Sequence, residues 1–327
     1  MNLVHSFKLI EIADEFHHCA SVVDTTLGPV VVGYVGQECT DLQRVFVWHN
    51  GKSVQLETKT GNPIIWEENG RLLMIYSLYK DTDSNGNTPI NPVQRWMYCD
   101  NYIVDVVISP NFLSVGPPEL IPDGFGLLAR CTPTVVDGVT LLPLYRELHP
   151  QCEIWEYVNG GIKKRAVIDQ VDPTIERIVY GSLGKGVAIQ PTLFNHDGKL
   201  IAWCRSVTQT YRCAWGSKSE DKGYTWSPLL PTALPNFNSS LVVFDDGSYV
   251  IHNPTKERDI IYIENMNTRK KLKLGYAPSK IIAGQRRSFS YPNYCWSLDK
   301  KTVYVVHTNT ERIALHEFSL DFLTHYV

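Results

Sequence analysis

Polar side chains flank short apolar runs at six places along this chain, in a pattern that could assemble a binding site. One polar residue stands at the start of the first run of each pair, and another follows the second run. They are His18, Asn62, Arg130, Gln190, Asn236, Asn238 and Tyr291 at the starts, and Glu38, Asp81, Glu147, Arg205, Asn253, Thr308 and Arg312 at the ends. Carboxylates, guanidinium groups, amides and a phenol bind polar ligands when they converge in a concave site. The residue types therefore indicate a polar pocket, provided that the fold brings these ends together.

Each pair of runs has the pattern of a β-hairpin. In "NPIIWEENGRLLMIY" and "QPTLFNHDGKLIAWC", a polar residue and a proline precede an apolar run, an Asn/Asp-Gly turn and a second apolar run. Tight turns of this composition join antiparallel strands. The six copies start at His18, Asn62, Thr132, Gln190, Asn238 and Tyr291.

The spacing of the hairpins predicts the architecture. Successive copies start 44 to 70 residues apart, and further strand-like runs such as "RVFVWH" and "IIYIEN" lie between them. Repeats of roughly 40–50 residues that hold about four strands are typical of propeller blades. We therefore expect residues 1–327 to form a single all-β domain, a six-bladed β-propeller. The first strand of each blade is innermost, so the polar residues named above should surround one mouth of the central channel.

One octet, "SEDKGYTW" at residues 219–226, has the composition of a self-bonded turn. Gly223 can adopt a positive φ without steric cost, and the carboxylate of Asp221 can accept hydrogen bonds from backbone groups just downstream. Ser219 can add a further local bond, while Trp226 needs an apolar surface to lie on. We expect this octet to join the third and fourth strands of the fourth blade.

Composition narrows the function classes. With 31 basic and 34 acidic residues the net charge is −3, which excludes a global field for nucleic acid. No run approaches the roughly 20 apolar residues that a membrane helix needs, and no signal-peptide pattern opens the chain, so we expect no membrane insertion and a cytoplasmic or virion-associated protein. The eight cysteines form no C-x-x-C pair, which favours reduced, buried thiols and predicts neither a metal site nor another cofactor.

The octet and the hairpins together resemble a known family. Ser-x-Asp-x-Gly-x-Thr-Trp is similar to the Asp-box of sialidases, and "LLARCTPTVVDGVTLLPLYRE", "QPTLFNHDGKLIAWCRS" and "FSYPNYCWSLDKKTVYVVH" resemble successive blades of the bacterial predicted-neuraminidase, or BNR-repeat-like, family. The likeness covers nearly the whole chain. It implies an exo-acting glycoside hydrolase of sialidase type, whose partner is a glycan or small sugar with a terminal acidic residue, typically sialic acid.

The resemblance also implies roles for the catalytic residues. A carboxylate nucleophile would be repelled by the acidic sugar, so sialidases use a tyrosine, for which the final-blade Tyr291 is the candidate. A phenol needs an adjacent carboxylate as base, and Glu147 is the candidate partner. Asp41 or Glu38, in the first-blade loop "GQECTD", could be the general acid.

The same resemblance implies a substrate-binding set. Arginines bind the sugar carboxylate bidentately, so Arg130 and Arg205 are the candidate clamp, with Arg287 or Arg312 completing a triad. The remaining rim residues could hydrogen-bond sugar hydroxyls or cap strand ends; they are His18, Asn62, Gln190, Asn236 and Asn238.

Two departures keep other functions open. Sialidases carry an Arg-Ile-Pro signature on the first blade, where this chain reads "HHCASVV", and only one clear Asp-box is present. A glycan-binding propeller without turnover would keep the amides and aromatic rings but could dispense with the tyrosine–carboxylate pair. A scaffold propeller, assembled in a virion or as a homo-oligomer, would need none of these side chains to bind a ligand.

Overall fold

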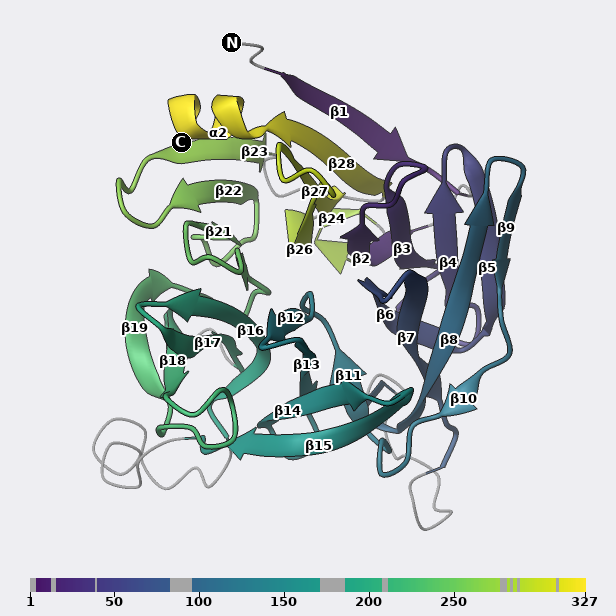
Figure 1. The fold of residues 1–327 in the computed structure, drawn as a ribbon, viewed down its shortest axis with the longest axis horizontal. Helices are drawn as coiled ribbons and strands as arrows, with labels where there is room; N and C mark the ends of the chain where they lie inside the picture. Colours follow the sequence, from purple (N-terminus) through teal and green to yellow (C-terminus); the bar gives the residue numbers. More distant parts are fainter. Residues whose placement is uncertain are drawn as a thin grey trace.

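The computed structural model describes residues 4–12, 16–38, 40–82, 96–170, 186–207, 211–276, 281–282, 285–286, 289–309 and 312–327. Six antiparallel sheets stand side by side around a common centre (Figure 1). The six-bladed β-propeller predicted from the hairpins is confirmed. Each predicted hairpin forms the two inner strands of one blade, except that the inner strand of blade 3 is split in two.

The first three blades follow the chain from the inside outward. Blade 1 holds β2 (His17–Val23), β3 (Val30–Val35), β4 (Arg44–His49) and β5 (Lys52–Thr58). Blade 2 holds β6 (Thr60–Glu68), β7 (Arg71–Tyr79), β8 (Cys99–Ser109) and β10 (Glu119–Leu120), with β9 (Phe112–Val115) also paired to β8. In blade 3 the inner strand is split into β11 (Leu127–Ala129) and β12 (Thr134–Val136), which both pair with β13 (Val139–Arg146), followed by β14 (Gln151–Val158) and β15 (Gly161–Ile168).

The last three blades complete the ring. Blade 4 holds β16 (Ala188–His196), β17 (Lys199–Ser206), β18 (Cys213–Ser219) and β19 (Leu230–Pro235). Blade 5 holds β20 (Val242–Val243), β21 (Tyr249–His252), β22 (Ile260–Asn265) and β23 (Lys271–Tyr276), and β24 (Ile281–Ile282) pairs with β25 (Gln285–Arg286) apart from the blades. Blade 6 holds β26 (Phe289–Trp296), β27 (Thr302–Asn309), β28 (Arg312–Ser319) and β1 (His5–Ile10), and the helix α2 (Leu320–Tyr326) follows.

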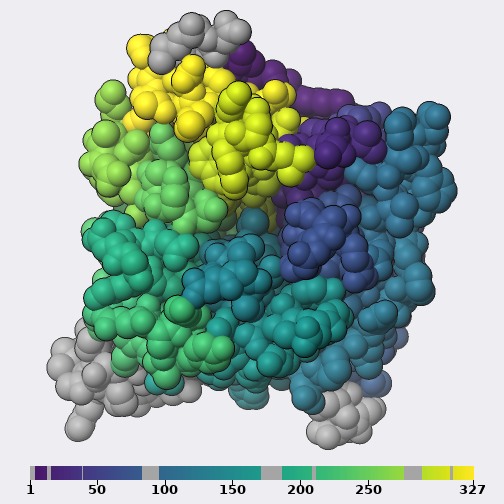
Figure 2. Space-filling view, in the orientation of Figure 1, coloured from purple at the N-terminus to yellow at the C-terminus, as the bar shows by residue number. Residues whose placement is uncertain are grey.

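The ring is closed by the N-terminal strand. β1 pairs antiparallel with β28, from His5 opposite Phe318 to Ile10 opposite Ile313, and so forms the outer edge of the last blade (Figure 1). In the space-filling view of Figure 2, the N-terminal purple segment accordingly adjoins the C-terminal yellow one. Pairing the first strand with the last blade joins the two ends of the chain, so that opening the ring requires breaking a strand ladder.

The core lies between the blades. Val32 and Val47 of blade 1, for example, belong to one buried cluster with Met74 and Val104 of blade 2. Each sheet is covered on both faces by its neighbours, which is why the inner strands are almost continuously apolar. The burial of these faces stabilises the ring as a whole, because no blade can cover its own faces.

The octet at 219–226 forms the predicted turn between β18 and β19. The Asp221 carboxylate accepts hydrogen bonds from the Thr225 amide (2.8 Å), the Thr225 hydroxyl (2.6 Å) and the Ser219 hydroxyl (2.8 Å). Ser219 Oγ accepts from the Gly223 amide at 2.7 Å, and Trp226 Nε1 donates to the Gly223 carbonyl at 3.1 Å. Gly223 has a φ of +92°, as its place in the turn requires. The octet is therefore a structural connector and carries no group toward the pocket described below.

A row of three histidines joins the closing strand to blade 6. His307 Nδ1 lies 3.0 Å from the Thr308 carbonyl, so that this nitrogen must carry the proton. His307 Nε2 must then accept from His316 Nε2 at 3.0 Å, and His316 Nδ1 must accept from His5 Nε2 at 3.2 Å. One carbonyl thus sets the tautomer of all three neutral rings. Burial lowers the pKa of His307 to about 4 and that of His316 to about 2.

No helix in the described part of the chain is long and apolar enough to cross a membrane.

Candidate functional site

A pocket opens at the end of the propeller where the inner strands begin. Its cavity of about 220 Å³ is lined by Glu38, Asn62, Tyr79, Trp96, Tyr145, Glu147, Gln190, Arg205 and Tyr291. Six of these nine were predicted from the sequence, so the ends of the hairpins do converge. Tyr79, Trp96 and Tyr145 were missed, although Tyr79 ends β7 and Tyr145 lies one residue before the end of β13. The prediction took only residues that follow the second strand of each hairpin, and Tyr79 and Tyr145 lie within those strands.

A repeated β-bulge directs side chains into this pocket. Near the start of β2, β6, β16 and β26 the register with the next strand shifts. One residue at each shift has a left-handed backbone, with φ of +52° at Cys19, +48° at Asn62 and +53° at both Gln190 and Tyr291. Bulges re-aim side chains, and a bulky residue such as tyrosine adopts this conformation only where the surroundings impose it, at a cost of roughly 1–3 kcal/mol. Three of the four bulge residues line the pocket.

Tyr291 is enclosed by cations and an aromatic ring. Its hydroxyl lies 3.5 Å from Arg205 Nη1, and its ring meets the His18 ring edge-on at 4.3 Å between centroids. Burial raises the pKa of the Tyr291 phenol, and Cys19 and Glu38 also raise it, whereas Arg205 and Arg258 lower it. The phenol is therefore protonated at neutral pH and needs a base to become a nucleophile.

Two carboxylates in the pocket have different surroundings. Glu147 Oε2 accepts a hydrogen bond of 2.7 Å from the Trp96 indole. Glu38 keeps an exposed surface toward the pocket, yet the protein around it raises the pKa of its carboxyl, chiefly by desolvation. Tyr34 lowers that pKa and the nearby charge of Glu147 raises it further. Paired carboxyl groups with such different surroundings can divide the tasks of acid and base.

Two arginines approach Tyr291 from blades 4 and 5. Arg205 extends from the end of β17, with Nε and Nη2 donating to Asn238 Oδ1 at 2.9 Å and 2.6 Å. Arg258 was missed by the sequence analysis; its Nη2 donates to the Asn238 carbonyl oxygen. Burial and the charge of Arg205 lower the pKa of Arg258, while Tyr291 and Glu38 raise it. Arg258 lies in the loop after β21, whereas the strand-end pattern pointed to Asn253.

Arg130 is buried and does not line the pocket. Its side chain is 1% exposed and donates to the Ala20 carbonyl at 3.0 Å and the Pro292 carbonyl at 2.8 Å. Its guanidinium carbon lies 5.2 Å from the centroid of the Tyr291 ring, on the buried side of the pocket. The sequence placed this arginine at the rim because it precedes a hairpin. In the structure it follows β11, and it bonds the bulged segments of blades 1 and 6 together.

This placement predicts a large loss of stability when Arg130 is removed. We expect Arg130→Ala to lower the free energy of unfolding by about 3 kcal/mol or more, because two buried carbonyl groups lose their donor and a cavity remains. Arg312→Ala is the control, since an exposed ion pair contributes less than about 1 kcal/mol. Urea denaturation of both variants measures the difference, and equal losses would contradict the structural role of Arg130.

Three other predicted positions lie away from the pocket or behind its wall, and a fourth cannot be placed. Asp41 has a 62% exposed side chain whose carboxylate is 3.9 Å from Lys59 Nζ, and Arg312 pairs with Glu11 at 3.2 Å on the outer edge of blade 6. Neither lines the cavity, because each sits in a surface segment beside a strand end. Asn236 is fully buried and caps the chain by donating to the Ser239 carbonyl at 2.7 Å. Arg287 lies outside the described residues.

His18 packs against Tyr291, and the amides of Asn62 and Gln190 line the pocket. His18 Nδ1 lies 3.0 Å from Thr308 Oγ1, and burial together with the charge of Arg130 keeps the pKa of this imidazole well below its usual value. Asn62 Nδ2 donates weakly to the Tyr79 hydroxyl at 3.4 Å, and Gln190 Nε2 donates to the Tyr145 hydroxyl at 3.0 Å. The amide oxygen of Gln190 is buried without a hydrogen-bond partner, so it can accept from a ligand hydroxyl. Among the described residues, no three His, Cys, Asp or Glu side chains are grouped to hold a metal ion.

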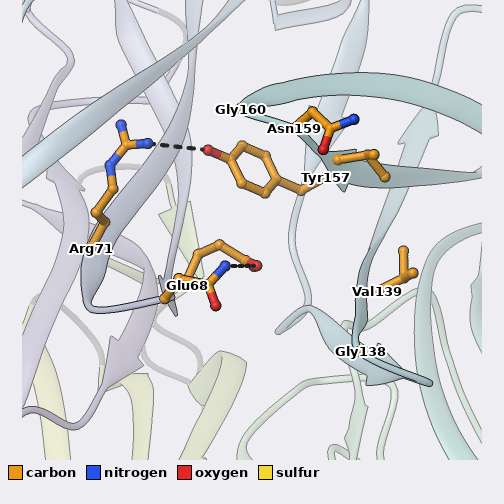
Figure 3. A pocket seen from close by; sticks show the side chains of 9 residues that line it. Glu68, Arg71, Gly138, Val139, Tyr157, Asn159 and Gly160 are labelled. Carbon is orange, nitrogen blue, oxygen red and sulfur yellow. Dashed lines mark hydrogen bonds between the residues drawn. The ribbon is translucent and has the colours of Figure 1, made fainter.

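A second cavity lies at the opposite end of blades 2 and 3, among their hairpin turns. It has a volume of about 360 Å³ and includes Glu68, Arg71, Tyr157 and Asn159 in its lining (Figure 3). Its charged groups are already paired, since Arg71 Nη2 is 2.8 Å from the Asp105 carboxylate and Glu68 accepts from Thr140 at 2.5 Å. The charged groups of this groove are therefore less available to a ligand than those of the first pocket.

Comparison with known proteins gives the chain a family. The family model described as "BNR repeat-like domain" matches residues 105–305, which is more than half of the 327 residues. This chain belongs to the BNR repeat-like family. No curated protein matches this BNR repeat-like chain significantly.

Solved structures place this BNR repeat-like protein among sialidase-like β-propellers. The sialidase of Trypanosoma rangeli matches with a TM-score of 0.61 and 12% identity over 95% of this chain, which spans only 56% of the trypanosomal chain. A Hadza microbial sialidase matches with a TM-score of 0.62 and 14% identity, over 94% of this chain and 66% of the other. The intramolecular trans-sialidase from Ruminococcus gnavus, in complex with oseltamivir carboxylate, matches with a TM-score of 0.61 and 10% identity over 95% and 96%. At such identities the likeness shows the fold alone.

Proposed function

We propose that this protein is an exo-acting glycoside hydrolase of sialidase type that removes a terminal acidic sugar from a glycan. The observation that carries the proposal is the contact between Tyr291 and Arg205, 3.5 Å apart in a small pocket that also holds Glu38 and Glu147. A phenol beside a cation and two carboxylates fits the tyrosine mechanism that sialidases use in place of the two-carboxylate scheme.

The arginines define the kind of sugar. Arg205 and Arg258 place two positive charges beside the Tyr291 hydroxyl. A carboxylate on the anomeric carbon would lie against these guanidinium groups and bring that carbon to the phenol. Arg258 thus takes the clamp position that the sequence analysis gave to Arg130.

The carboxylates supply the proton transfers. Glu147 accepts the Tyr291 proton as the phenol oxygen bonds to the anomeric carbon, and Glu38 protonates the leaving oxygen as the glycosidic bond breaks. Ionised Glu38 then takes a proton from the attacking water, the tyrosyl–sugar bond breaks, and Glu147 returns its proton to the phenolate. Glu38 is favoured over Asp41 as the acid because Asp41 does not line the cavity.

The size of the pocket supports exo action. About 220 Å³ is below the 300–1,000 Å³ typical of ligand pockets, so the cavity suits one sugar residue better than an internal stretch of a chain.

The proposed acid predicts a pH dependence. Because the surrounding protein raises the pKa of Glu38 above its ordinary value, chiefly by desolvation, the group donates its proton below the raised pKa, and activity should fall as pH rises through it. Glu38→Gln should remove this alkaline limb and lower turnover of natural sialosides about 10²–10⁴-fold, with a much smaller loss for aryl sialosides, whose leaving groups need no acid. Asp41→Asn is the matched control and should leave the turnover of both substrates and the alkaline limb of the pH profile unchanged. The reverse result would identify Asp41 as the general acid.

A second function, glycan binding without turnover, is favoured by two observations. The start of β2, where sialidases carry the first arginine, presents His18 and Cys19 here, and burial raises the pKa of Tyr291. Hydrolysis of a fluorogenic sialoside by the purified protein separates the two functions. Turnover that depends on Tyr291 supports the hydrolase, whereas binding of sialosides with no turnover supports the binding protein.

A further inference from the structure

We propose that Asn238 is a positioning residue that holds Arg205 and Arg258 together with neutral oxygen atoms, so that both positive charges remain available to an anionic ligand. The inference rests on the proposed function in taking that ligand to be an acidic sugar.

The contacts show one residue that serves both arginines. The Asn238 side-chain oxygen accepts from Arg205 Nε and Nη2 at 2.9 Å and 2.6 Å, which orients the guanidinium plane and leaves Nη1 directed to the Tyr291 hydroxyl. The main-chain carbonyl oxygen of the same residue accepts from Arg258 Nη2. Both acceptors of Asn238 are therefore used by guanidinium groups, and this residue has no need of the sugar to satisfy them.

The backbone explains why an asparagine stands here. Asn238 has a φ of +61°, and its main-chain N–H donates to Ser206 Oγ at 3.2 Å. Ser206 follows Arg205 at the end of β17. Asparagine enters the left-handed region at low cost compared with most residues that have a side chain. The left-handed turn brings the side-chain oxygen to blade 4 and the main-chain oxygen to the Arg258 loop of blade 5. A glycine could make the turn but would lack the side-chain acceptor.

The neutrality of the amide matters for binding. An aspartate with the same shape would form ion pairs with Arg205 and offset the charge that a ligand carboxylate needs. The amide oxygen instead orients the guanidinium group without an opposing charge. Burial, and after it the nearby positive charge of Arg205, lowers the pKa of Arg258, whereas Tyr291 and Glu38 raise it.

Two substitutions separate orientation from charge. Asn238→Gly keeps the backbone conformation and removes the acceptor, while Asn238→Asp keeps the acceptor and adds a charge. Asn159→Gly is the control, because Asn159 also has a left-handed backbone, with φ of +53°, but lies in the exposed turn between β14 and β15. Thermal melting checks that each variant is folded.

Three readouts decide the outcome. Proton exchange of Arg205 Nε–H, followed by NMR, reports the clamp itself. Titration with inorganic sulfate reports the paired positive charges, and titration with N-acetylneuraminic acid, with its methyl ester as the neutral counterpart, tests the proposed ligand. We expect Asn238→Gly to speed the exchange of Arg205 Nε–H and to weaken the binding of both sulfate and N-acetylneuraminic acid at least about tenfold. We expect Asn238→Asp to leave the exchange of Arg205 Nε–H slow but to weaken the binding of both anions by a similar factor. Binding of the methyl ester should change little.

The result that overturns the proposal is unchanged Nε–H exchange in Asn238→Gly, or sulfate binding by Asn238→Asp as tight as in the unsubstituted protein. Failure of the proposed function looks different. In that case the unsubstituted protein binds sulfate but not N-acetylneuraminic acid, while exchange and sulfate binding still respond to the Asn238 substitutions.

Discussion

Tyr291→Phe should lower turnover of a fluorogenic sialoside by at least about 10³-fold. The change removes only the hydroxyl that lies 3.5 Å from Arg205, and phenylalanine preserves the ring that packs against His18. Without the phenol oxygen no tyrosyl–sugar intermediate can form, so the loss should appear in kcat and leave sialoside binding within a few fold.

Tyr145→Phe is the matched control for this prediction. Tyr145 lines the same pocket, but its hydroxyl accepts from Gln190 at 3.0 Å, and burial raises the pKa of this phenol well above its usual value. We expect less than about a tenfold loss from this variant, through a loosened wall. Full turnover by Tyr291→Phe would remove Tyr291 as the nucleophile, and equal losses in the two variants would indicate a general effect on the pocket.

Acidification should destabilise the ring closure, and this is the second large effect. His307 and His316 have folded-state pKa values of about 4 and about 2 against 6.5 for the unfolded chain. The unfolded chain therefore binds more protons below pH 6.5, so stability is full above that pH and falls as the pH drops. His307 alone should account for about 3 kcal/mol by pH 4, from a shift of roughly 2.5 units at 1.36 kcal/mol each.

Urea denaturation between pH 7 and pH 4.5 measures this loss, in a range above the titration of most carboxylates. His316→Phe should reduce the slope of stability against pH by about one proton, because a phenyl ring does not titrate. The phenyl ring can still stack parallel to Phe318, as the imidazole does. His196→Phe is the control, since His196 is exposed beside Asp197 and should leave the slope unchanged. A steep slope that persists in His316→Phe would place the acid sensitivity elsewhere.

Much of the architecture followed from local patterns. The polar residue, apolar run, Asn/Asp-Gly turn and second apolar run predicted the hairpins correctly, because turn chemistry and short apolar runs act over neighbouring residues. The turn at 219–226 was predicted for the same reason, as all its hydrogen bonds lie within eight residues. The family resemblance added the likeness to sialidases, and the structural comparison supports that fold.

The sequence by itself determined the six hairpins, and with them which strand ends meet at one mouth, so Tyr291, Glu147, Glu38 and Arg205 were predicted to lie there, and all four line the pocket. Only the tertiary structure decided that Arg258 also approaches the phenol, that Arg130 is buried and bonded to main-chain carbonyl groups, and that β1 closes the last blade. The physical reason is separation along the chain. Whether a guanidinium group faces the pocket or a buried carbonyl depends on partners tens to hundreds of residues away, and no local pattern encodes which of these will be its neighbour.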